Sequence, residues 1–553
     1  MNGAAIIVNT LIEQGVDTVF GYPGGMVINI YDELYKSSSK IKHYLSCHEQ
    51  GAAHAADGYA RTTGKTGVVI ATSGPGATNL ITGIATAYLD STPMVFITGN
   101  VPCGLIGRDS FQEVDIFGIT MPITKHNYIV KDITKLADTI RQAFKIANEG
   151  RPGPVLIDVP KDIQVTEYDY KEAKKYEASH SKVIDLSMMD EATKIIEKAK
   201  KPFIYIGGGV VMSDAGEEIK ALAEKIDAPV GSSMMGLTAI SNSLPEFLGM
   251  TGMHGKYGAS RAMAESDLII AVGTRFSDRA TGNTKEYAKG RKIIHIDIDP
   301  AEIGKNVPAY VSLVGDVKEV LDKLLAAIKK QTRKEWKEEV AKIKNSYENT
   351  VCMPKNELNP QCLIETVRGM TNDDTIIVTD VGQHQMWVAQ YYRFEKPRTF
   401  ITSGGLGTMG FGLGAAIGAC IGSDKKRTVL FTGDGSFHMN FIELATAVTN
   451  KLPIVVIVLN NRVLGMVRQW QDIFFGSRYS NTVIDRKTDF AEVANAMGAK
   501  GIHLNDFTKL KDVLKEAFDQ NGPVVIDATI DKDEKVLPMI IPGGTIKDIL
   551  LRR

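Results

Sequence analysis

The sequence predicts an α/β protein built from three doubly wound domains, each with a parallel sheet covered by helices on both faces. Three observations lead to this prediction. Short, strongly apolar runs end in glycine-rich or acidic turns and continue into segments with helical spacing, which is typical of β-α-β units. Two charged passages divide the chain into three blocks, and the first and last blocks share an internal repeat. A length of 553 residues, 44% of them hydrophobic, is enough for about three or four such domains.

The last block contains the clearest of these units, between residues 428 and 461. The runs TVLF and IVVIVL predict two buried parallel strands, and FIELATAV between them predicts the connecting helix. The carboxyl ends of parallel strands meet the amino end of the connecting helix at one edge of the sheet, so we expect Asp434 beside Asn460 and Asn461. Ligands bind at such an edge in this architecture.

The first block repeats this pattern. Its run GVVIATSGPGATNLITGIATAYLDSTPMVFITGN contains a strand, a glycine-rich turn, a helix and a second strand. IATA ends six residues before Pro93, and Asn100 follows seven residues later. In the last block LATA likewise ends six residues before Pro453, and Asn460 follows seven residues after that proline. The two blocks are therefore predicted to share one fold, but only the last carries GDG and NN where the first carries GPG and GN.

Two charged passages, which we expect to be rich in helix, separate the blocks at residues 166–182 and 329–360. They place the three predicted domains at residues 1–168, 185–330 and 358–553. In the middle domain, FIYIGGGVVMSDAGEEI and DLIIAVGTRFSDRATG have the pattern of strand-turn-helix units in a smaller Rossmann-like domain. A glycine triplet alone is weak evidence for a nucleotide site.

The composition excludes some classes of function. A net charge of −1 gives no overall electrostatic footprint for nucleic acid or for an anionic membrane. The chain begins with a helical pattern that has no basic flank or cleavage site, and no apolar run is long enough for a membrane span. We therefore expect a soluble, cytoplasmic protein that binds neither nucleic acid nor membrane. Five cysteines without a C-x-x-C pair argue against disulfides and zinc, and we interpret them as buried thiols.

Asp434 is the first candidate for a functional residue. A carboxylate at the end of a buried strand needs a partner, because an unpaired buried charge is costly. Mg²⁺ prefers a few protein oxygens and completes its shell with phosphate oxygens and water, so Asp434 with the amide oxygen of Asn461 suits this ion. The predicted helix start adds N–H donors for an anion. These features together predict a diphosphate bridged by Mg²⁺ at this edge of the sheet.

GDG followed by NN in this context resembles the motif through which thiamin-diphosphate enzymes bind their cofactor. Over nearly its full length the chain resembles the catalytic subunits of the acetolactate synthase (acetohydroxyacid synthase) family. The resemblance implies that the first and last domains bind the pyrimidine and the diphosphate of thiamin diphosphate. It implies that Mg²⁺ is bound by Asp434, Asn461 and Val463. The implied cofactor contacts in the same segment are Gly433, Gly435 and Ser436.

The segment HEQGAAHAADGYAR resembles the family's signature around its activating glutamate, and Glu49 takes that place. A glutamate at a helix start is otherwise more often a residue that compensates the helix dipole. In the family this carboxyl group favours the imino form of the cofactor's pyrimidine, so the resemblance makes Glu49 a catalytic residue. SGGLGTMGFGLGAA supplies Gly407 and Met409, which correspond to residues that face the pyrimidine and hold the cofactor in a bent shape.

In the middle domain, GTRFSDR and IIHIDID resemble the segments through which acetolactate synthases hold FAD. The flavin does no net redox work in this family. Related thiamin enzymes keep the same domain with an empty or degenerate pocket, so the alternative of a chain without FAD stays open. The FAD-binding residues that the resemblance implies are Arg151, Gly207, Gly208, Arg275, Asp297 and Asp316.

Three further segments, FQE, PKD and GMVRQWQ, match family positions in the substrate channel. The implied catalytic residues are Gln112 and Lys161, and the implied substrate contacts are Phe111, Met466 and Trp470. A tryptophan in an amphipathic segment is more often part of the core, but in biosynthetic members a tryptophan here favours 2-ketobutyrate as acceptor. The chain departs from the family at His438, where glutamine is frequent, and at Cys47, where arginine is frequent.

The resemblance implies that the chain decarboxylates pyruvate on thiamin diphosphate and condenses the hydroxyethyl unit with a second 2-ketoacid. The products are 2-acetolactate, or 2-aceto-2-hydroxybutyrate when 2-ketobutyrate is the acceptor. This reaction is the first common step of valine, leucine and isoleucine biosynthesis. A FAD-linked pyruvate oxidase, a catabolic acetolactate synthase and a catalytically silent scaffold stay open as alternatives.

The resemblance also implies a homodimer in which the first block of one chain and the last block of its partner form each site. Association into a tetramer and binding of a regulatory small subunit stay open. The sequence does not decide feedback inhibition, the preference between pyruvate and 2-ketobutyrate, or whether FAD is bound.

Overall fold

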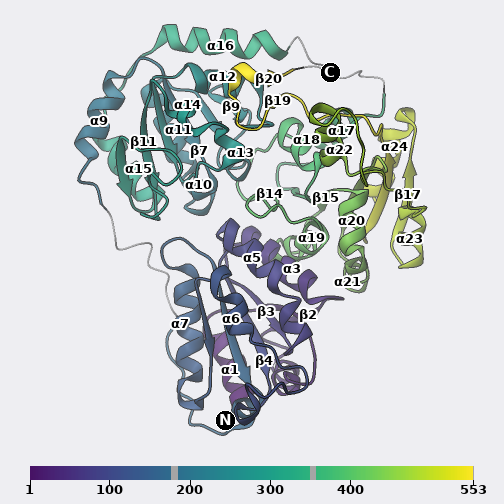
Figure 1. Ribbon diagram of the computed structural model, residues 1–553. Helices are drawn as coiled ribbons and strands as arrows, with labels where there is room; N and C mark the ends of the chain where they lie inside the picture. Colours follow the sequence, from purple (N-terminus) through teal and green to yellow (C-terminus); the bar gives the residue numbers. More distant parts are fainter. Residues whose placement is uncertain (176–184, 349–356, 552–553) are drawn as a thin grey trace.

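A computed structural model describes residues 1–175, 185–348 and 357–551. The chain forms three α/β lobes, each built on a parallel sheet of six strands (Figure 1). The first block is the lower lobe in this view, the middle block the upper left lobe and the last block the upper right lobe. The predicted fold class is therefore confirmed. Near the C-terminus, β19 (Met539–Ile540) and β20 (Ile549–Leu550) form a separate antiparallel pair.

The first sheet is fully parallel, and its central strands are continuous apolar runs because helices bury both of their faces. Its strands lie in the order β2 (Lys42–Leu45), β1 (Thr18–Tyr22), β3 (Gly67–Ala71), β4 (Met94–Asn100), β6 (Pro154–Pro160) and β5 (His126–Ile129). Its helices are α1 (Gly3–Glu13), α2 (Ile28–Lys36), α3 (Glu49–Thr63), α4 (Pro75–Thr78), α5 (Ile81–Asp90), α6 (Ile116–Thr120), α7 (Leu136–Asn148) and α8 (Lys161–Val165).

The last sheet has the same strand order as the first, strand for strand, which confirms the fold shared by the two blocks. Its strands lie in the order β14 (Phe400–Ile401), β13 (Ile376–Thr379), β15 (Thr428–Gly433), β16 (Ile454–Asn460), β18 (Val524–Thr529) and β17 (Lys500–Leu504). Its helices are α17 (Pro360–Met370), α18 (Gln383–Tyr391), α19 (Gly412–Gly422), α20 (Asp434–Asn440), α21 (Leu444–Thr449), α22 (Gly465–Phe474), α23 (Phe490–Ala496) and α24 (Leu510–Phe518).

The middle sheet has the strand order of a dinucleotide-binding fold, in which the first and fourth strands lie side by side at the centre. Its strands lie in the order β12 (Val311–Val314), β11 (Lys292–Asp297), β10 (Leu268–Val272), β7 (Pro202–Ile206), β8 (Val230–Ser232) and β9 (Phe247–Met250). Its helices are α9 (Met189–Lys198), α10 (Gly208–Met212), α11 (Gly216–Ile226), α12 (Tyr257–Glu265), α13 (Asp278–Thr281), α14 (Thr284–Ala288), α15 (Val317–Ala327) and α16 (Lys334–Glu348). Ligands bind where the chain reverses direction across such a sheet, beyond β7 and β10.

The helix predicted over FIELATAV is interrupted, so this prediction is wrong in its extent. A helix, α20, already begins at Asp434, a 3₁₀ turn covers Phe441–Glu443, and α21 follows. Asn440 leaves the helical region with φ −148°, and its side chain donates to the carbonyl oxygen of Gly410 (3.0 Å). The interruption turns Glu443 toward the first domain, where it accepts hydrogen bonds.

The charged passages differ from each other, although both were expected to be rich in helix. The second contains α16, whereas residues 166–175 of the first are not helical and form a single β-bridge with the N-terminus. This stretch has no apolar face that a helix could bury against the domain. Residues 176–182 and 349–356 of the passages lie outside the described residues, and the predicted domain limits stay predictions.

Helices α3 and α19 join the first and last domains by packing backbone against backbone. A Cβ at Gly418 would overlap the carbonyl oxygen of Ala55, and a Cβ at Gly58 would overlap that of Ala415. Gly414 faces Gly51 in the same way, with its Cβ position 2.8 Å from the carbonyl oxygen of Gly51. Glycine is required at these points because only a residue without a side chain permits so close an approach.

Two predictions about the chain's environment can be compared with the structure. Among the residues that the structure describes, no helix is both long and apolar enough to cross a membrane. The interpretation of all cysteines as buried thiols is wrong, since Cys420 alone is buried among the four cysteines that the structure describes. Cys47 is exposed at the start of α3, Cys103 and Cys362 are half-buried, and Cys352 lies outside the described residues.

We expect the substitution Gly418→Ala to destabilise the chain, because the new methyl group would force the backbones of α3 and α19 apart. Overpacking of this kind costs about 1–3 kcal/mol and outweighs the small helix-propensity gain of alanine. The matched control is Gly369→Ala in α17, where a Cβ meets nothing within 4 Å. Thermal unfolding followed by circular dichroism should show a lower midpoint for the first variant only. Equal midpoints for both variants would contradict the close helix contact.

Candidate active site

Asp434 lies at the carboxyl edge of the last sheet, directly after β15 and at the first position of α20. Its side chain is only 4% exposed. Burial raises the pKa of this carboxyl group to about 7, although the N–H groups of Gly435 and Arg462 lower it. No cationic side chain among the described residues forms an ion pair with it. A carboxylate held in this way gains most from a bound cation.

The turn after β16 brings a second set of oxygen atoms to the same place. The register of β15 and β16 sets Gly433 beside Leu459, so the residues that follow both strands are neighbours. Asn461 accepts a hydrogen bond from the N–H of Val463 (3.2 Å) and donates to Gln383 (3.2 Å). Because the N–H of Arg462 also acts on Asp434, the turn and the carboxylate lie against each other, as the sequence predicts.

This donor set fits a magnesium ion. The Asp434 carboxylate, the Asn461 amide oxygen and the Val463 carbonyl are hard oxygen ligands of the kind that Mg²⁺ prefers. They leave the remaining positions of an octahedral shell for phosphate oxygens and water. The buried carboxylate without a counter-charge is the structural observation that favours this ion.

Side chains at the glycines of the GDG motif would press on their neighbours. A Cβ at Gly433 would lie 3.0 Å from Nδ1 of His384, and a Cβ at Gly435 would lie 2.9 Å from the side chain of Leu464. Half-buried Met409 lies beside Gly435, with its methyl carbon 3.7 Å from the same Cβ position. Met409 is thus beside the candidate metal-binding segment, where a cofactor bound through Mg²⁺ would contact it.

Gly407 and Ser436 lie in the same region but differ in their surroundings. Gly407 is exposed and has φ +72°, a left-handed conformation that favours glycine. The buried Ser436 hydroxyl donates to the carbonyl oxygen of Val381 (2.9 Å). That bond ties α20 to the turn after β13, so the hydroxyl of Ser436 already stabilises the fold.

Two functional candidates in this domain were missed by the sequence reasoning. Asp380 follows β13 and accepts from the N–H groups of Val381 (2.8 Å), Gly410 (2.9 Å) and Gly412 (3.0 Å), which fixes the segment that carries Met409. His384 is buried, and its Nε2 has no hydrogen-bond partner among the described residues. Burial lowers the pKa of His384 to about 3, so the ring is neutral. The signal was present, since DVGQH follows an apolar strand as GDG does.

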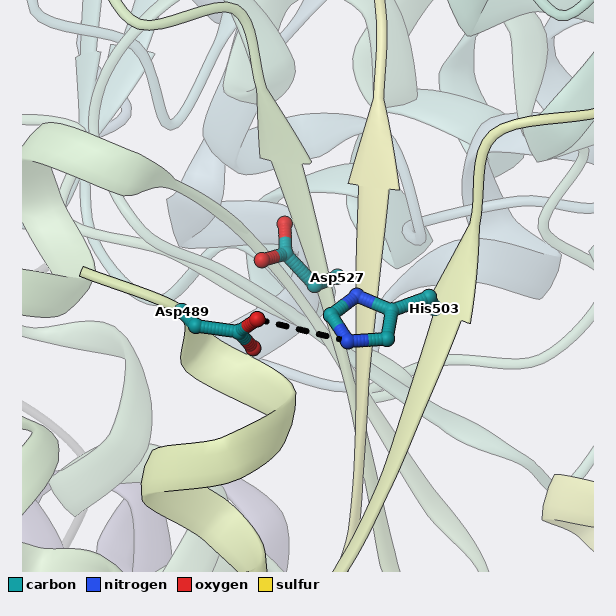
Figure 2. Close-up of side chains that lie close together, drawn as sticks. All are labelled: Asp489, His503 and Asp527. Carbon is teal, nitrogen blue, oxygen red and sulfur yellow. Dashed lines mark ion pairs between the residues drawn. The ribbon is translucent and has the colours of Figure 1, made fainter. Parts of the chain in front are cut away.

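A third group of polar residues supports the asparagine turn. Figure 2 shows Asp489, His503 and Asp527 close together, with one possible ligand atom from each within 4.8 Å of the others. His503 Nε2 lies 3.4 Å from Asp489 Oδ2. The buried Asp527 accepts from Asn460 Nδ2 (2.9 Å) and from the N–H of Phe490 (3.3 Å). We interpret Asp527 as the residue that fixes Asn460 and thereby the neighbouring Asn461.

Glu49 is the first residue of α3 and is 8% exposed. Its Oε2 accepts a hydrogen bond from Asn79 Nδ2 (2.9 Å). Its Oε1 has no hydrogen-bond partner among the described residues and lies 3.1 Å from the position of a Cβ at Gly76. The carboxyl group is therefore held from one side and keeps one oxygen for a ligand.

The other candidates of the first domain lie near the carboxyl edge of its sheet. Gln112 has φ 59°, and its backbone packs on Gly74 in the same glycine-rich turn that contains Gly76. Phe111 is 83% exposed, which is unusual for an aromatic side chain without a partner. Lys161 starts α8 directly after β6 and is half-buried. These residues thus surround the edge at which Glu49 lies.

Within one chain the two halves of the candidate site are not bonded directly to each other among the described residues. The side chain of Glu49 is bonded to Asn79 of its own domain. No hydrogen bond or ion pair among the described residues joins Glu49 to Asp434 or to Asn461. The first and last domains instead meet along α3 and α19.

A cavity of about 400 Å³ lies where the three domains meet. Arg151 of the first domain and Arg275 of the middle domain both line it. Arg151 donates to Ser91 (2.8 Å) and to Glu302 (2.7 Å), whereas the Arg275 guanidinium has no ion-pair partner among the described residues. Burial and the neighbouring Arg151 lower the pKa of Arg275. An anionic ligand would relieve this repulsion.

The remaining candidates of the middle domain lie near the place where the chain reverses direction across the sheet. Asp297 ends β11, and burial raises the pKa of its carboxyl group to about 6. Asp316 caps α15 and accepts from Ser213 Oγ (2.6 Å). Gly208 lines the cavity with both acids, but Gly207 does not. A Cβ at Gly207 would overlap the carbonyl oxygen of Gly273, so this glycine serves packing.

The candidate substrate residues of the last domain are on α22. Trp470 is half-buried and lies outside the buried core. Its ring makes an edge contact with Phe474 (5.7 Å between centroids), and the Arg279 guanidinium of the middle domain lies 5.6 Å from its ring centre. Met466 instead packs against the core of the domain. The indole thus faces the boundary between the last and middle domains.

Comparisons with known proteins agree with this arrangement. Three family models described as domains of a "Thiamine pyrophosphate enzyme" match the chain. The N-terminal TPP binding domain matches residues 1–119, the central domain residues 189–324, and the C-terminal TPP binding domain residues 380–528. The fold and these matches define a thiamine pyrophosphate enzyme.

Similarity to individual relatives narrows the class. The "Acetolactate synthase large subunit" of Buchnera aphidicola subsp. Schizaphis graminum is 44% identical, over 100% of this chain and 99% of the relative. The Corynebacterium glutamicum protein of the same name is 45% identical over 99% and 90% of the two chains. A "Probable acetolactate synthase large subunit" of Methanocaldococcus jannaschii is 45% identical over 100% and 95%. The chain belongs to the acetolactate synthase large subunit family.

We expect Asp434→Asn to separate folding from cofactor binding. The pKa of Asp434 is raised, so its ionised form costs stability that accumulates as the pH rises from 3.8 to about 7. At pH 8 the amide removes that cost, and the cofactor-free variant should unfold at or above the wild-type temperature. Loss of a charged metal ligand should weaken binding of thiamine pyrophosphate with Mg²⁺ by at least roughly 10- to 100-fold. Thermal shifts with and without both compounds measure the two effects.

The matched control is Asp485→Asn, which neutralises an exposed carboxylate in the same domain. It should change neither the unfolding temperature nor the shift produced by the cofactor. An Asp434→Asn chain that binds cofactor and Mg²⁺ as tightly as wild type would exclude Asp434 as a metal ligand.

Proposed function

We propose that the chain converts two molecules of pyruvate and one proton into 2-acetolactate and CO₂. With 2-ketobutyrate as acceptor the product is 2-aceto-2-hydroxybutyrate, and the reaction is the first common step of branched-chain amino acid biosynthesis. The observation that carries this proposal is the retention of Asp434, Asn461 and Glu49 at two sheet edges of a chain similar to acetolactate synthase large subunits over its full length.

Asp434, Asn461 and Val463 would hold Mg²⁺, and through it the diphosphate of the cofactor, beside Gly433 and Gly435 of the GDG turn. When bound, thiamine pyrophosphate supplies a carbon that takes up the acyl group of a 2-ketoacid and stabilises the charge left by decarboxylation. Met409 would support the cofactor from the side of Gly435, and Asp380 holds the backbone around Met409 in place. Gly407 lies open nearby and would let the pyrimidine approach the backbone.

Glu49 would hold and move a proton at the pyrimidine ring. Its free Oε1 is the atom available for this contact, while Asn79 fixes Oε2. A positioned carboxyl group of this kind is a general acid–base catalyst, which typically contributes about 10²–10⁴-fold in rate. Gly76 leaves the space in front of Oε1 open.

The substrate residues divide into two groups. Phe111, Gln112 and Lys161 belong to the edge of the first sheet, and we assign them the binding of the ketoacid carboxylate and carbonyl and the exclusion of water. Met466 and Trp470 on α22 would form the wall against which the acceptor packs. The ring of Phe111 is exposed and no described residue covers it, so it is free to contact a substrate or a partner chain.

The cavity between the three domains suits FAD. Arg151 and Arg275 would hold the diphosphate of the flavin nucleotide, because two guanidinium groups line one cavity and Arg275 forms no ion pair among the described residues. Asp297 ends β11 and lines the same cavity, where its carboxylate would accept from hydroxyl groups of the nucleotide. Gly208 and Asp316 complete the assignment, and Gly207 contributes through packing. The flavin would support the fold and take no part in net redox chemistry.

We further propose that the enzyme is a cytoplasmic homodimer, with Glu49 of one chain serving the cofactor held by Asp434 of its partner. Among the described residues Glu49 is bonded to Asn79 and not to Asp434 or Asn461 of its own chain, which supports this arrangement. The relatives' designation as large subunits supports a regulatory small subunit as an additional partner.

The function is tested with pyruvate, Mg²⁺ and thiamine pyrophosphate, followed by acid decarboxylation of the product to acetoin and its colorimetric detection. We expect acetoin to form only when both cofactors are present. Anaerobic spectra of the flavin on addition of pyruvate provide the comparison with a pyruvate oxidase, which would bleach FAD rapidly. No acetoin from a chain that binds both cofactors would refute the proposed reaction.

The same assay tests the role of Glu49 through the substitution Glu49→Gln, which keeps the size of the side chain but cannot relay a proton. We expect kcat to fall by about 10²–10⁴-fold, with a much smaller change in cofactor affinity. Glu33→Gln on α2 is the matched substitution, and it should retain activity because the half-buried Glu33 carboxylate pairs with Lys36 of the same helix. Unchanged exchange of the cofactor's C2 proton in Glu49→Gln would show that another group activates the cofactor.

Trp470→Leu should lower the preference for 2-ketobutyrate without disturbing the cofactor. One methylene-sized contact in an apolar pocket is worth about 1–3 kcal/mol, so the ratio of acetohydroxybutyrate to acetolactate should drop by roughly 10-fold or more. The measurement offers both ketoacids in competition. Phe475→Leu is the control, because Phe475 is an exposed aromatic residue just after the same helix. A wild-type product ratio in Trp470→Leu would remove Trp470 from the acceptor pocket.

A further inference from the structure

Glu443 connects the last domain to the residues just before Glu49. It is 1% exposed, and its carboxylate accepts from the N–H of His48 (2.9 Å) and the N–H of Cys47 (3.1 Å to each oxygen). The Thr446 hydroxyl also donates to it (2.8 Å). A buried carboxylate of one domain is thus bonded to two consecutive backbone N–H groups of another.

The hydrogen bonds at this point suit an ionised carboxylate, although burial raises the pKa of Glu443 overall. Cys47 and His48 precede α3, a helix of 15 residues whose amino end carries partial positive charge. Burial raises the pKa of Glu443, while the Thr446 hydroxyl and the N–H groups of Cys47 and His48 lower it. Only the ionised group can accept hydrogen bonds with both oxygens and donate none.

Two details of the chain are explained by this contact alone. A Cβ at Gly51 would overlap Oε1 of Glu443, so the second residue after Glu49 must be glycine for the carboxylate to reach α3. The 3₁₀ turn Phe441–Glu443 interrupts the helix expected there and directs Glu443 across the domain boundary. An exposed glutamate on a regular helix would need neither feature.

We infer that Glu443 is a positioning residue that fixes the start of α3, and thereby Glu49, relative to the last domain. Glu443 accepts a hydrogen bond from the N–H of His48, and Glu49 is the next residue in the sequence. The contact between α3 and α19 holds the helix along its length, and Glu443 holds its amino end. The inference rests on the proposed catalytic role of Glu49, whereas the contact itself does not.

Displacement of a catalytic group by about 1 Å can cost about 10²-fold in rate. Loss of the Glu443 carboxylate should therefore reduce kcat through Glu49, with little effect on the cofactor's diphosphate, which Asp434 and Asn461 would hold. It should also release the N–H groups of Cys47 and His48. A residue that merely stabilised the fold would lower stability and cofactor affinity together.

The test compares Glu443→Gln, Glu443→Asp and the matched surface control Glu516→Gln, which removes only an exposed pair with Lys500. In the cofactor-free chain, hydrogen exchange by mass spectrometry should be about 10- to 100-fold faster at Cys47 and His48 in Glu443→Gln, the range for a lost bond to a charged group. In the loaded enzyme, kcat and the rate of C2-proton exchange should fall by about 10²-fold. Affinity for thiamine pyrophosphate should stay within about 3-fold of wild type, a difference under 1 kcal/mol.

Glu443→Asp keeps the charge on a shorter side chain, so it should recover part of the activity, and it replaces Glu443→Gln if that variant does not fold. Unchanged amide exchange would refute the contact. Faster exchange with wild-type kcat and C2-proton exchange would refute the positioning role. An equal loss of stability, cofactor affinity and kcat would also refute it. If wild type forms no acetolactate, amide exchange still tests the contact and C2-proton exchange still tests the effect on Glu49.

Discussion

The backbone contact between α3 and α19 is the constraint on which the candidate site depends. Glycines on both helices let carbonyl groups occupy the space of side chains, as at Gly418 and Gly58. Close-packed backbones have few alternative arrangements, so the relative position of the first and last domains is fixed. Glu49 is the first residue of one of these helices, and the other follows the segment with Gly407 and Met409. The contact therefore sets the positions of residues from both domains at once.

Much of the fold follows from the sequence because buried parallel strands are continuous apolar runs. The spacing of Pro93 and Pro453 to the following asparagines predicts the repeat, and the identical strand order confirms it. The break before α21 could not be predicted, since the groups around it have long-range partners: Asn440 donates to Gly410, and Glu443 accepts from Cys47 and His48. The hydrophobic periodicity of a segment predicts that segment alone and gives no information about hydrogen-bond partners elsewhere in the chain.

Site residues were predictable where the motif itself requires a particular chemistry. An acid after an apolar strand and two asparagines after the next predict the group around Asp434. Asp380 follows the same rule but stands outside a known motif, and His384 has a role only through its position beside Gly433. Gly207 shows the opposite case, because the sequence cannot distinguish a glycine that lines a cavity from one that packs on Gly273.

The buried acids of the last domain differ in how completely the protein uses their oxygens. Asp380 accepts three backbone N–H groups, and Glu443 accepts two N–H groups and a hydroxyl. Asp527 binds an amide and an N–H group. Asp434 has no side-chain donor among the described residues, and its pKa is raised by burial. Asp380, Glu443 and Asp527 join segments that are distant along the chain, so their carboxylates stabilise the fold. Within the described part of the chain, Asp434 accepts only from backbone N–H groups and lies against the turn that carries Asn461 and Val463. This position beside other oxygen ligands, and not burial alone, separates Asp434 from its neighbours as the residue available for a metal.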